Sequence, residues 1–200
     1  MFGFRTMTED LSALIRRRLT GRSRRVITDP QQRRAAVLVP LFREGAETYV
    51  LFTRRTETVE HHRGQISLPG GEEDALDRGP AETALRETEE ELGIPRGEVR
   101  VLGLLDDVYT FVSGFVITPV VGTISHPITL QVNPHEIAEV LSVPLNVFRD
   151  PARQRVEVRE RPTGERVEVL FYDHGPHEIW GATARIMKMF IDAVFGEEEP

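Results

Sequence analysis

Residues 70–94 read GGEEDALDRGPAETALRETEEELGI, a stretch that predicts a glycine turn followed by an acid-rich helix. Pro80 suits the first position of this helix, because its missing N–H needs no partner there. Gly93 suits the position just past the end, where a left-handed residue is common. The small and apolar residues between them recur at steps of three and four, which predicts one buried stripe: Ala81, Leu85, Thr88 and Leu92.

Three glutamates, Glu87, Glu90 and Glu91, fall on another face of the predicted helix, since residues three and four apart are neighbours. Like charges at this spacing repel one another, and a divalent cation would turn the repulsion into attraction. A solvated acidic face is the alternative, because paired glutamates are common on exposed helices. The Pro-Gly-Gly turn upstream, the arginine directly before Glu87 and the glycine after the helix favour a metal site.

Composition and charge limit the class of protein. The chain has 200 residues, of which 40% are hydrophobic and 28% charged, as expected of one soluble globular domain spanning residues 1–200. No apolar run is long enough for a membrane span, and the start lacks a signal-peptide pattern. There is no cysteine, which suits a cytoplasmic protein, and the net charge of −7 argues against general nucleic-acid binding.

The remaining pattern predicts an α+β domain with a mixed sheet between helices. A helix is expected over residues 8–19, with Thr8 as N-cap and Leu11, Leu14, Ile15 and Leu19 facing inward. Residues 21–34 predict a charged loop, and residues 197–200 a frayed acidic tail. Strands are expected at 35–42, 49–53, 100–105 and 115–123, with a hairpin at 156–159 and 166–171. A short helix beginning at Pro134 and a closing helix over 177–195 complete the prediction.

Two stretches precede the acidic helix: residues 51–56 read LFTRRT and residues 61–71 read HHRGQISLPGG. Residues 86–94, RETEEELGI, fit the pattern R-E-x-x-E-E-x-G followed by an apolar residue, which looks like the Nudix box. Together they resemble the coenzyme A pyrophosphatase branch of the Nudix hydrolase superfamily, whose members carry a pattern like L-L-T-x-R-S-x-x-x-R-x-x-x-G-x-x-x-F-P-G-G ahead of the box. The positions that fit this upstream motif are Thr53, Arg55, Gly64, Pro69, Gly70 and Gly71.

The chain departs from the family pattern in two places. Glu60 stands where the upstream motif has an arginine, although Arg63 lies nearby in sequence. Fourteen residues separate Gly71 from Arg86, one more than in the general box, and Asp77 stands near the position of the usual outer glutamate. The resemblance nevertheless extends over most of residues 35–190.

The resemblance implies a Nudix fold and hydrolysis of the pyrophosphate bond of coenzyme A or its thioesters, with Mg²⁺ or Mn²⁺ as cofactor. It implies Glu87, Glu90 and Glu91 as metal ligands, together with the carbonyl of Gly71. Arg86 is expected to pair with a box carboxylate and orient it. A small nucleotide is the expected substrate, and a homodimer is possible because dimers are common among relatives.

The resemblance leaves the general base open between the box and a later loop. Glu136 and Glu139 are candidates because they are three apart on the short helix expected at Pro134 and would share a face, and Glu90 is the alternative. An equally plausible role for that pair is to cap and solvate the helix. The residues expected to contact the substrate are Arg55, His61, His62 and Arg63.

Two other functions fit the same sequence. One is a Nudix hydrolase for another nucleoside diphosphate derivative, such as ADP-ribose, NADH or a capped RNA end, which the charge reversal at Glu60 favours. The other is a non-catalytic nucleotide-sensing module on the same fold. The complete set of box glutamates argues against the second, because a sensor needs no full set of metal ligands.

Overall fold

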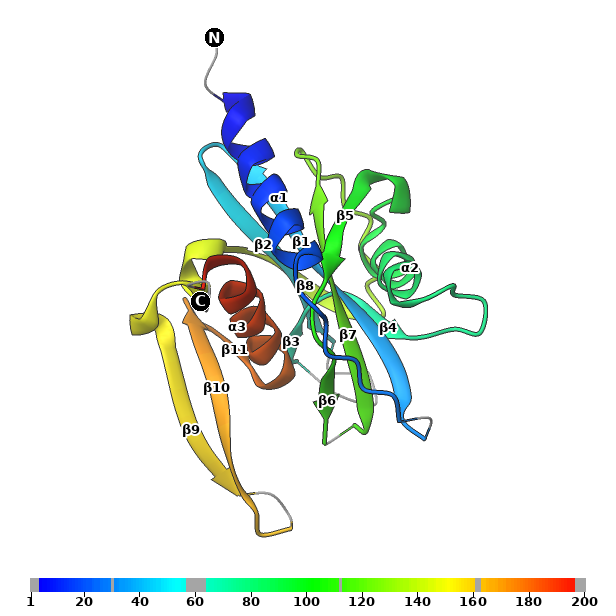
Figure 1. Ribbon diagram of the computed structural model, residues 1–200, viewed down its shortest axis with the longest axis vertical. Coiled ribbons are helices and arrows are strands. Elements are labelled where there is room, and N and C mark those ends of the chain that lie inside the picture. Colours follow the sequence, from blue (N-terminus) through cyan, green and yellow to red (C-terminus); the bar gives the residue numbers. More distant parts are fainter. Residues whose placement is uncertain (1–3, 30, 57–63, 112, 161–162, 197–200) are drawn as a thin grey trace.

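The computed structural model describes residues 4–29, 31–56, 64–111, 113–160 and 163–196. Within these residues the chain forms two sheets and three α-helices, in agreement with the predicted α+β class (Figure 1). The helices are α1 (Phe4–Thr20), α2 (Pro80–Leu92) and α3 (Gly181–Phe195). The strands are β1 (Arg33–Glu44), β2 (Glu47–Arg55), β3 (Ile66–Ser67), β4 (Gly70–Glu72), β5 (Val99–Leu104), β6 (Val108–Thr110), β7 (Phe115–Ile124), β8 (Ile137–Pro144), β9 (Gln154–Glu160), β10 (Arg166–His174) and β11 (His177–Trp180).

Strand β1 lies at the centre of the larger, mixed sheet. One edge of β1 pairs antiparallel with β2 and β4, and the other pairs parallel with β7, from Arg33 opposite Phe115 to Leu41 opposite Thr123. Strand β8 extends the sheet beyond β2, and β5 and β6 pair with β7. A nearly continuous apolar run over residues 35–42 explains the central position, because a strand covered on both faces needs apolar side chains on both.

Helices cover both faces of this sheet, and alternate residues of β1 show which helix covers which face. Val39 and Leu41 pack in one core cluster with Ile15 of α1 and Phe190 of α3. Leu38 packs in the other cluster with buried residues of α2. Figure 1 shows α1 and α3 near one another and α2 apart from them. The sheet therefore has an α1/α3 face and an α2 face.

Helix α1 begins earlier than the sequence predicts. It already includes Phe4, so Thr8 lies inside the helix and is not its N-cap. The expected inward side is confirmed, because Ile15 and Leu19 are buried and Leu11 and Leu14 pack against the core. None of the described helices has the length and apolar character needed to cross a membrane.

The charged segment after α1 is a loop, as predicted, and a buried carboxylate anchors it. Asp107, which is 2% exposed, accepts hydrogen bonds from Arg24 Nη1 at 2.7 Å, from Thr118 Oγ1 at 2.7 Å and from the Ile27 N–H at 2.9 Å. The Arg34 guanidinium lies 3.4 Å from the same carboxylate. A buried charge needs such partners, so Asp107 fixes the loop to the edge of the sheet.

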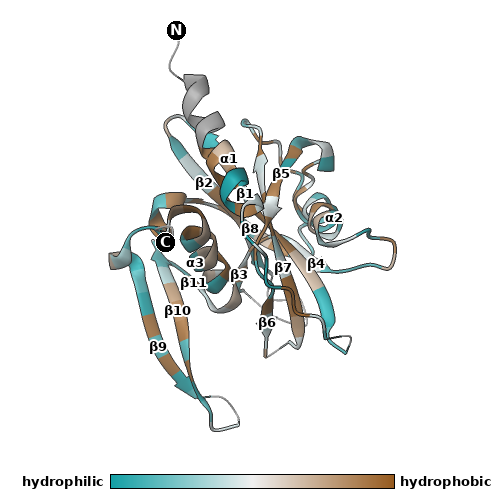
Figure 2. Cartoon of the chain, viewed as in Figure 1, coloured by the Kyte–Doolittle hydropathy of each residue, from teal (hydrophilic) through white to brown (hydrophobic). Residues whose placement is uncertain are grey.

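The predicted hairpin forms as β9 and β10, but the closing helix is shorter than expected. Residues 177–180 form β11, which pairs antiparallel with β10 and places Trp180 over the Phe171 ring at a centroid distance of 6.0 Å. Gly175 and Gly181, with φ of 59° and 66°, bound this strand, and α3 begins only at Gly181. Apolar and polar residues alternate along β9 (Figure 2), whereas β10 contains an apolar run at residues 169–171.

The prediction of a short helix beginning at Pro134 is wrong. Residues 134–136 form a turn, and Ile137 begins β8, which pairs antiparallel with β2. Leu141 and Val143, two residues apart on β8, are both buried in the core cluster of the α1/α3 face, which is the pattern of a strand. Tertiary pairing with β2 therefore decides this segment.

Candidate functional site

Helix α2 carries the acidic residues, and both predicted ends are confirmed. Pro80 is its first residue, and Gly93 follows its last with a φ of 68°, in the left-handed region. Ala84, Thr88 and Leu92 are buried against the sheet, while Ala81 and Leu85 pack beside them. This packing fixes the helix so that the glutamates lie beside the glycine turn.

The glycine turn fits closely against two of the glutamates. Gly71 pairs with Ala36 of β1, and a Cβ atom at Gly71 would lie 2.4 Å from the carboxyl carbon of Glu87. The Gly70 N–H donates a hydrogen bond to Glu91 Oε2 at 3.2 Å. Only a residue without a side chain leaves room for the Glu87 carboxylate at this position.

Burial shapes the electrostatics of these carboxylates. Glu91 is 3% exposed, and its burial raises the pKa to about 8, although the Gly70 N–H and Arg55 favour the charged form. Burial also raises the pKa of Glu87, and the nearby charges of Glu90 and Glu136 add to the rise. A buried carboxylate with negative neighbours is more stable when it binds a proton or a cation than when its negative charge is uncompensated.

Arg86 joins the box carboxylates into one network. Its Nη1 donates to Glu87 Oε1 at 2.6 Å and to Glu90 Oε2 at 3.2 Å, and its Nη2 donates to the Glu72 carbonyl at 2.9 Å. The same guanidinium binds Asp77, with 3.0 Å between Nη2 and Oδ2, and these hydrogen bonds lower the pKa of Asp77 to about 2. The lengthened loop thus brings Asp77 onto the arginine that orients the glutamates.

Glu136 lies on the box side of the sheet. Its negative charge helps to raise the pKa values of Glu87 and Glu91, which places it within electrostatic range of both. Asn133 Nδ2 donates to Glu136 Oε1 at 3.1 Å, and the Asn133 N–H donates to the Glu91 carbonyl at 2.9 Å. Asn133 therefore links Glu136 to the end of α2, a contact that the sequence analysis missed. Pro134 was expected only to begin a short helix, and the sequence pattern assigned no role to Asn133.

Glu139 does not share a face with Glu136, contrary to the expectation of a common helix face. It alternates along β8 with Val140, which packs in the core cluster beneath α2, so its side chain faces the α1/α3 side. There Glu139 Oε2 accepts a hydrogen bond from Arg54 Nε at 2.8 Å, and Oε1 lies 3.7 Å from His177 Nε2.

Arg55 is the upstream-motif residue that reaches the box. Its Nη1 lies 3.7 Å from Glu91 Oε1, and its buried Nε has no hydrogen-bond partner among the described residues. Because neighbouring residues of a strand face opposite sides, Arg55 points toward α2 while Arg54 points away. Glu60, His61, His62 and Arg63 lie outside the described residues, so the substrate contacts expected of His61, His62 and Arg63 remain predictions.

The donor set fits a hard divalent cation. Carboxylate oxygens are the ligands that Mg²⁺ and Mn²⁺ prefer, and the crowding of Glu87, Glu90 and Glu91 favours positive charge between them. In the described ranges, no three acidic or histidine side chains already converge on one ion position. Arg86 binds Glu87 through Oε1 and Glu90 through Oε2, so each carboxylate has a second oxygen with which it could bind a cation.

Comparisons with known proteins bear on this arrangement. The family model described as NUDIX domain matches residues 32–166. An uncharacterized Nudix hydrolase NudL of Photorhabdus laumondii is 38% identical over 163 residues, which cover 81% of this chain and 85% of that protein. A second NudL, from Pectobacterium atrosepticum, is 40% identical over 158 residues, covering 78% and 80% of the two chains. The crystal structure of a MutT/nudix family protein from Enterococcus faecalis superposes with a TM-score of 0.55 at 15% identity, covering 96% of this chain and 76% of that chain, which supports the fold alone.

Proposed function

We propose that this chain, which belongs to the Nudix family, hydrolyses the pyrophosphate bond of coenzyme A and its thioesters. The products would be adenosine 3′,5′-bisphosphate and 4′-phosphopantetheine or its acyl form. One observation carries the proposal: Arg55, from the motif that resembles the coenzyme A pyrophosphatase branch, lies beside Glu91 of the box. The upstream motif and the box therefore contribute to one site.

The reaction is attack of water on phosphorus. The water oxygen forms the new P–O bond, the bridging P–O bond breaks, and the water proton passes to a base. Glu87, Glu90 and Glu91, with the Gly71 carbonyl, would hold Mg²⁺ or Mn²⁺, which supplies positive charge for the phosphoryl oxygens and lowers the pKa of water. Arg86 holds Glu87 and Glu90 in place before substrate arrives, and such preorganisation lowers the cost of positioning.

Glu136 is the base that we favour. It lies on the α2 face near Glu87 and Glu91, and Asn133 fixes its carboxylate by one hydrogen bond. Glu90 remains the alternative, since it belongs to the box itself. Glu139 faces the other side of the sheet, where Arg54 already binds it, so it is the weakest of the three candidates.

Arg55 is the described residue best placed to bind a substrate phosphate. Its Nε–H has no partner among the described residues, and an arginine can donate two parallel hydrogen bonds to phosphate oxygens. Its proximity to Glu91 would bring that phosphate to the box carboxylates. His61, His62 and Arg63 are proposed as further contacts on the basis of the motif.

The test is incubation of the purified protein with coenzyme A and Mg²⁺ or Mn²⁺, with and without EDTA, followed by separation of the products. We expect cation-dependent release of adenosine 3′,5′-bisphosphate and 4′-phosphopantetheine. Glu87→Gln should abolish it, while Glu89→Gln should not, because Glu89 lies on the same helix but pairs with Arg96 at 2.8 Å.

A substrate panel of ADP-ribose, NADH and capped RNA separates the alternatives. Cleavage of one of these without cleavage of coenzyme A would retain the site and refute the branch. Binding of nucleotides without any cleavage would support the sensing module instead.

A further inference from the structure

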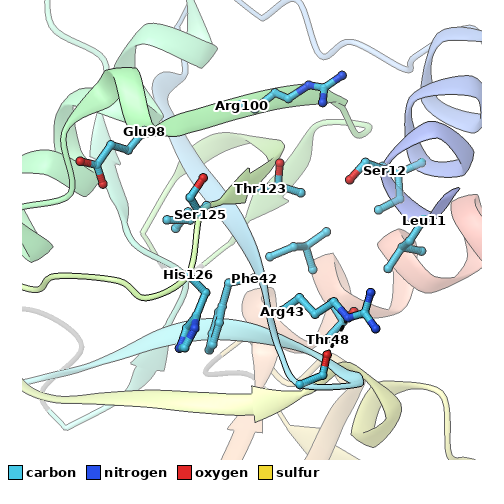
Figure 3. Close-up of a pocket in the computed structure, with 14 residues that line it drawn as sticks. Leu11, Ser12, Phe42, Arg43, Thr48, Glu98, Arg100, Thr123, Ser125 and His126 are labelled. Atoms are coloured by element: carbon cyan, nitrogen blue, oxygen red, sulfur yellow. Dashed lines mark hydrogen bonds between the residues drawn. The ribbon is translucent and has the colours of Figure 1, made fainter. Parts of the chain in front are cut away.

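A cavity of about 500 Å³ lies between α1 and one end of the large sheet (Figure 3). Its wall is built from α1, the β1–β2 hairpin, the start of β5 and the end of β7. Its lining includes Leu11, Ser12, Phe42, Glu98, Arg100 and His126. This volume is within the range of small-molecule binding sites.

The cavity is separate from the box. The glycine turn pairs with β1 at Ala36 and Val37, whereas the cavity contacts β1 at residues 41–43. A strand rises about 3.3 Å per residue, so roughly 15–20 Å of β1 separate the two regions. A ligand in the cavity therefore does not touch the box carboxylates.

The inner wall of the cavity is apolar. Ile15 and Leu41 are fully buried beneath it, and Leu11 packs beside them. On another side the Phe42 ring stacks on the imidazole of His126, with 5.8 Å between their centroids. Such a wall favours an aliphatic or flat aromatic body.

The rim is polar and includes two arginines, Arg43 and Arg100, and the carboxylate of Glu98. Figure 3 shows Arg100 near Ser12 and Thr123 on one side of the cavity, and Arg43 near Thr48 on the other. Arg43 Nε donates to the Gly45 carbonyl at 2.8 Å, so Arg43 is already held within the β1–β2 hairpin. The anion is therefore expected at Arg100.

Arg100 is the residue of the cavity that is best placed to bind an anion. It is exposed on β5 opposite Thr123 of β7, and it forms no ion pair or side-chain hydrogen bond within the described part of the chain. Several other arginines, by contrast, hold a carboxylate, as Arg96 does with Glu89. A guanidinium without such a partner beside an apolar wall can bind an incoming carboxylate or phosphate.

We propose that this cavity binds a small organic anion, a carboxylate or phosphate group attached to an apolar body. The anionic group would lie against Arg100 and the rim hydroxyls, and the apolar body against Leu11 and the stacked rings of Phe42 and His126. Because the wall combines α1 with four strands, the ligand would tie α1 to the sheet. The proposal does not depend on the substrate proposed above.

The first test uses the full chain labelled with ¹⁵N and three probes of equal chain length: octanoate, octyl phosphate and the neutral 1-octanol. We expect at least one anion to shift the amide signals of residues 41–48 and 123–126 and to raise the melting temperature. Binding of only one of the two anions would identify the anionic group. Octanol should bind at least about tenfold more weakly, as expected for the loss of a charge-assisted hydrogen bond.

Variants decide whether the contact with Arg100 is specific. Arg100→Gln should weaken binding of the anion about tenfold and leave turnover of the nucleotide substrate unchanged. Arg166→Gln, an exposed arginine on β10 of the other sheet, is the matched control and should bind as the wild type does. Absence of binding, equal binding of octanol, or unchanged affinity in Arg100→Gln would each overturn the proposal.

Discussion

Replacing Gly71 by alanine tests whether the position of the Glu87 carboxylate determines activity. The added Cβ would lie 2.4 Å from Glu87 Cδ and Oε2, and ordinary contacts begin at 3.4 Å, so the carboxylate must move by about 1.0 Å. The Gly71 carbonyl is retained. A displacement of about 1 Å in a catalytic group costs about 100-fold in rate, so we expect kcat/KM to fall by about this factor.

The same substitution should cost little stability. Gly71 is not in the left-handed region, and the atoms it would meet are the end of a flexible side chain. The main loss is the hydrogen bond between Arg86 and Glu87, so we expect unfolding free energy to fall by no more than about 2 kcal/mol. Steady-state kinetics and urea unfolding of the same preparation measure the two effects.

Two other glycines provide controls. Gly97→Ala meets nothing within 4 Å and should change neither quantity. Gly70→Ala would place a Cβ 2.3 Å from the Ala36 carbonyl oxygen with φ at 152°, so it should destabilise the fold itself. The reasoning is refuted if Gly71→Ala keeps turnover within a few fold of wild type, or if it unfolds as readily as Gly70→Ala.

Three further predictions concern the same region. Glu91→Gln should reduce turnover at least about 100-fold with an unchanged circular dichroism spectrum, and unchanged turnover would exclude Glu91 as a ligand. Glu136→Gln should lower kcat about 100-fold or more, while Glu139→Gln should change it less than about threefold; the reverse order would exchange their roles. The lowered pKa of Asp77, about 2 against an ordinary 3.8, means that its stabilisation is complete above about pH 5 and is lost as pH falls toward 2. Asp77→Asn should therefore lose about 2 kcal/mol of unfolding free energy at pH 7 and show a flatter decline between pH 5 and 2, which urea unfolding across pH measures; an identical decline would remove the assigned ion pair with Arg86.

The box helix was predictable because its signals are local. Pro80 and Gly93 mark its two ends, and the buried stripe follows from spacing within one helix. The central strands were predictable for a similar reason, since apolar runs as short as residues 35–42 identify buried strands.

The segments that were wrongly predicted are decided by strand pairing. Ile137 begins a strand because β2, which is distant in sequence, lies alongside it, and no short window of sequence shows that partner. Residues 177–180 form a strand because they pair with β10 across the Gly175-Pro176 turn, a local hairpin that the helical spacing of the following residues masked. The register around Arg54 and Arg55 likewise decides that Glu139 faces away from the box.

The anchoring role of Asp107 was also invisible in the sequence. Its hydrogen-bond donors Arg24 and Ile27 precede it by 83 and 80 residues. An acidic pair at the end of a strand is typically a solvated turn, and only the folded structure shows that Asp107 is buried. Such contacts depend on which elements meet, which local propensity does not determine.

The parallel pairing of β1 with β7 has a consequence for how the protein is made. Residues 33–41 cannot complete their second edge until residues 115–123 have been synthesised, although β2 and β4 can occupy the first edge much earlier. A nascent chain that already carries the whole box therefore still exposes one edge of its central strand, β1. Unpaired edges of this kind promote association between chains. Ribosomes that stall before residue 115 should release aggregation-prone fragments, so the yield of soluble protein depends on uninterrupted translation through β7.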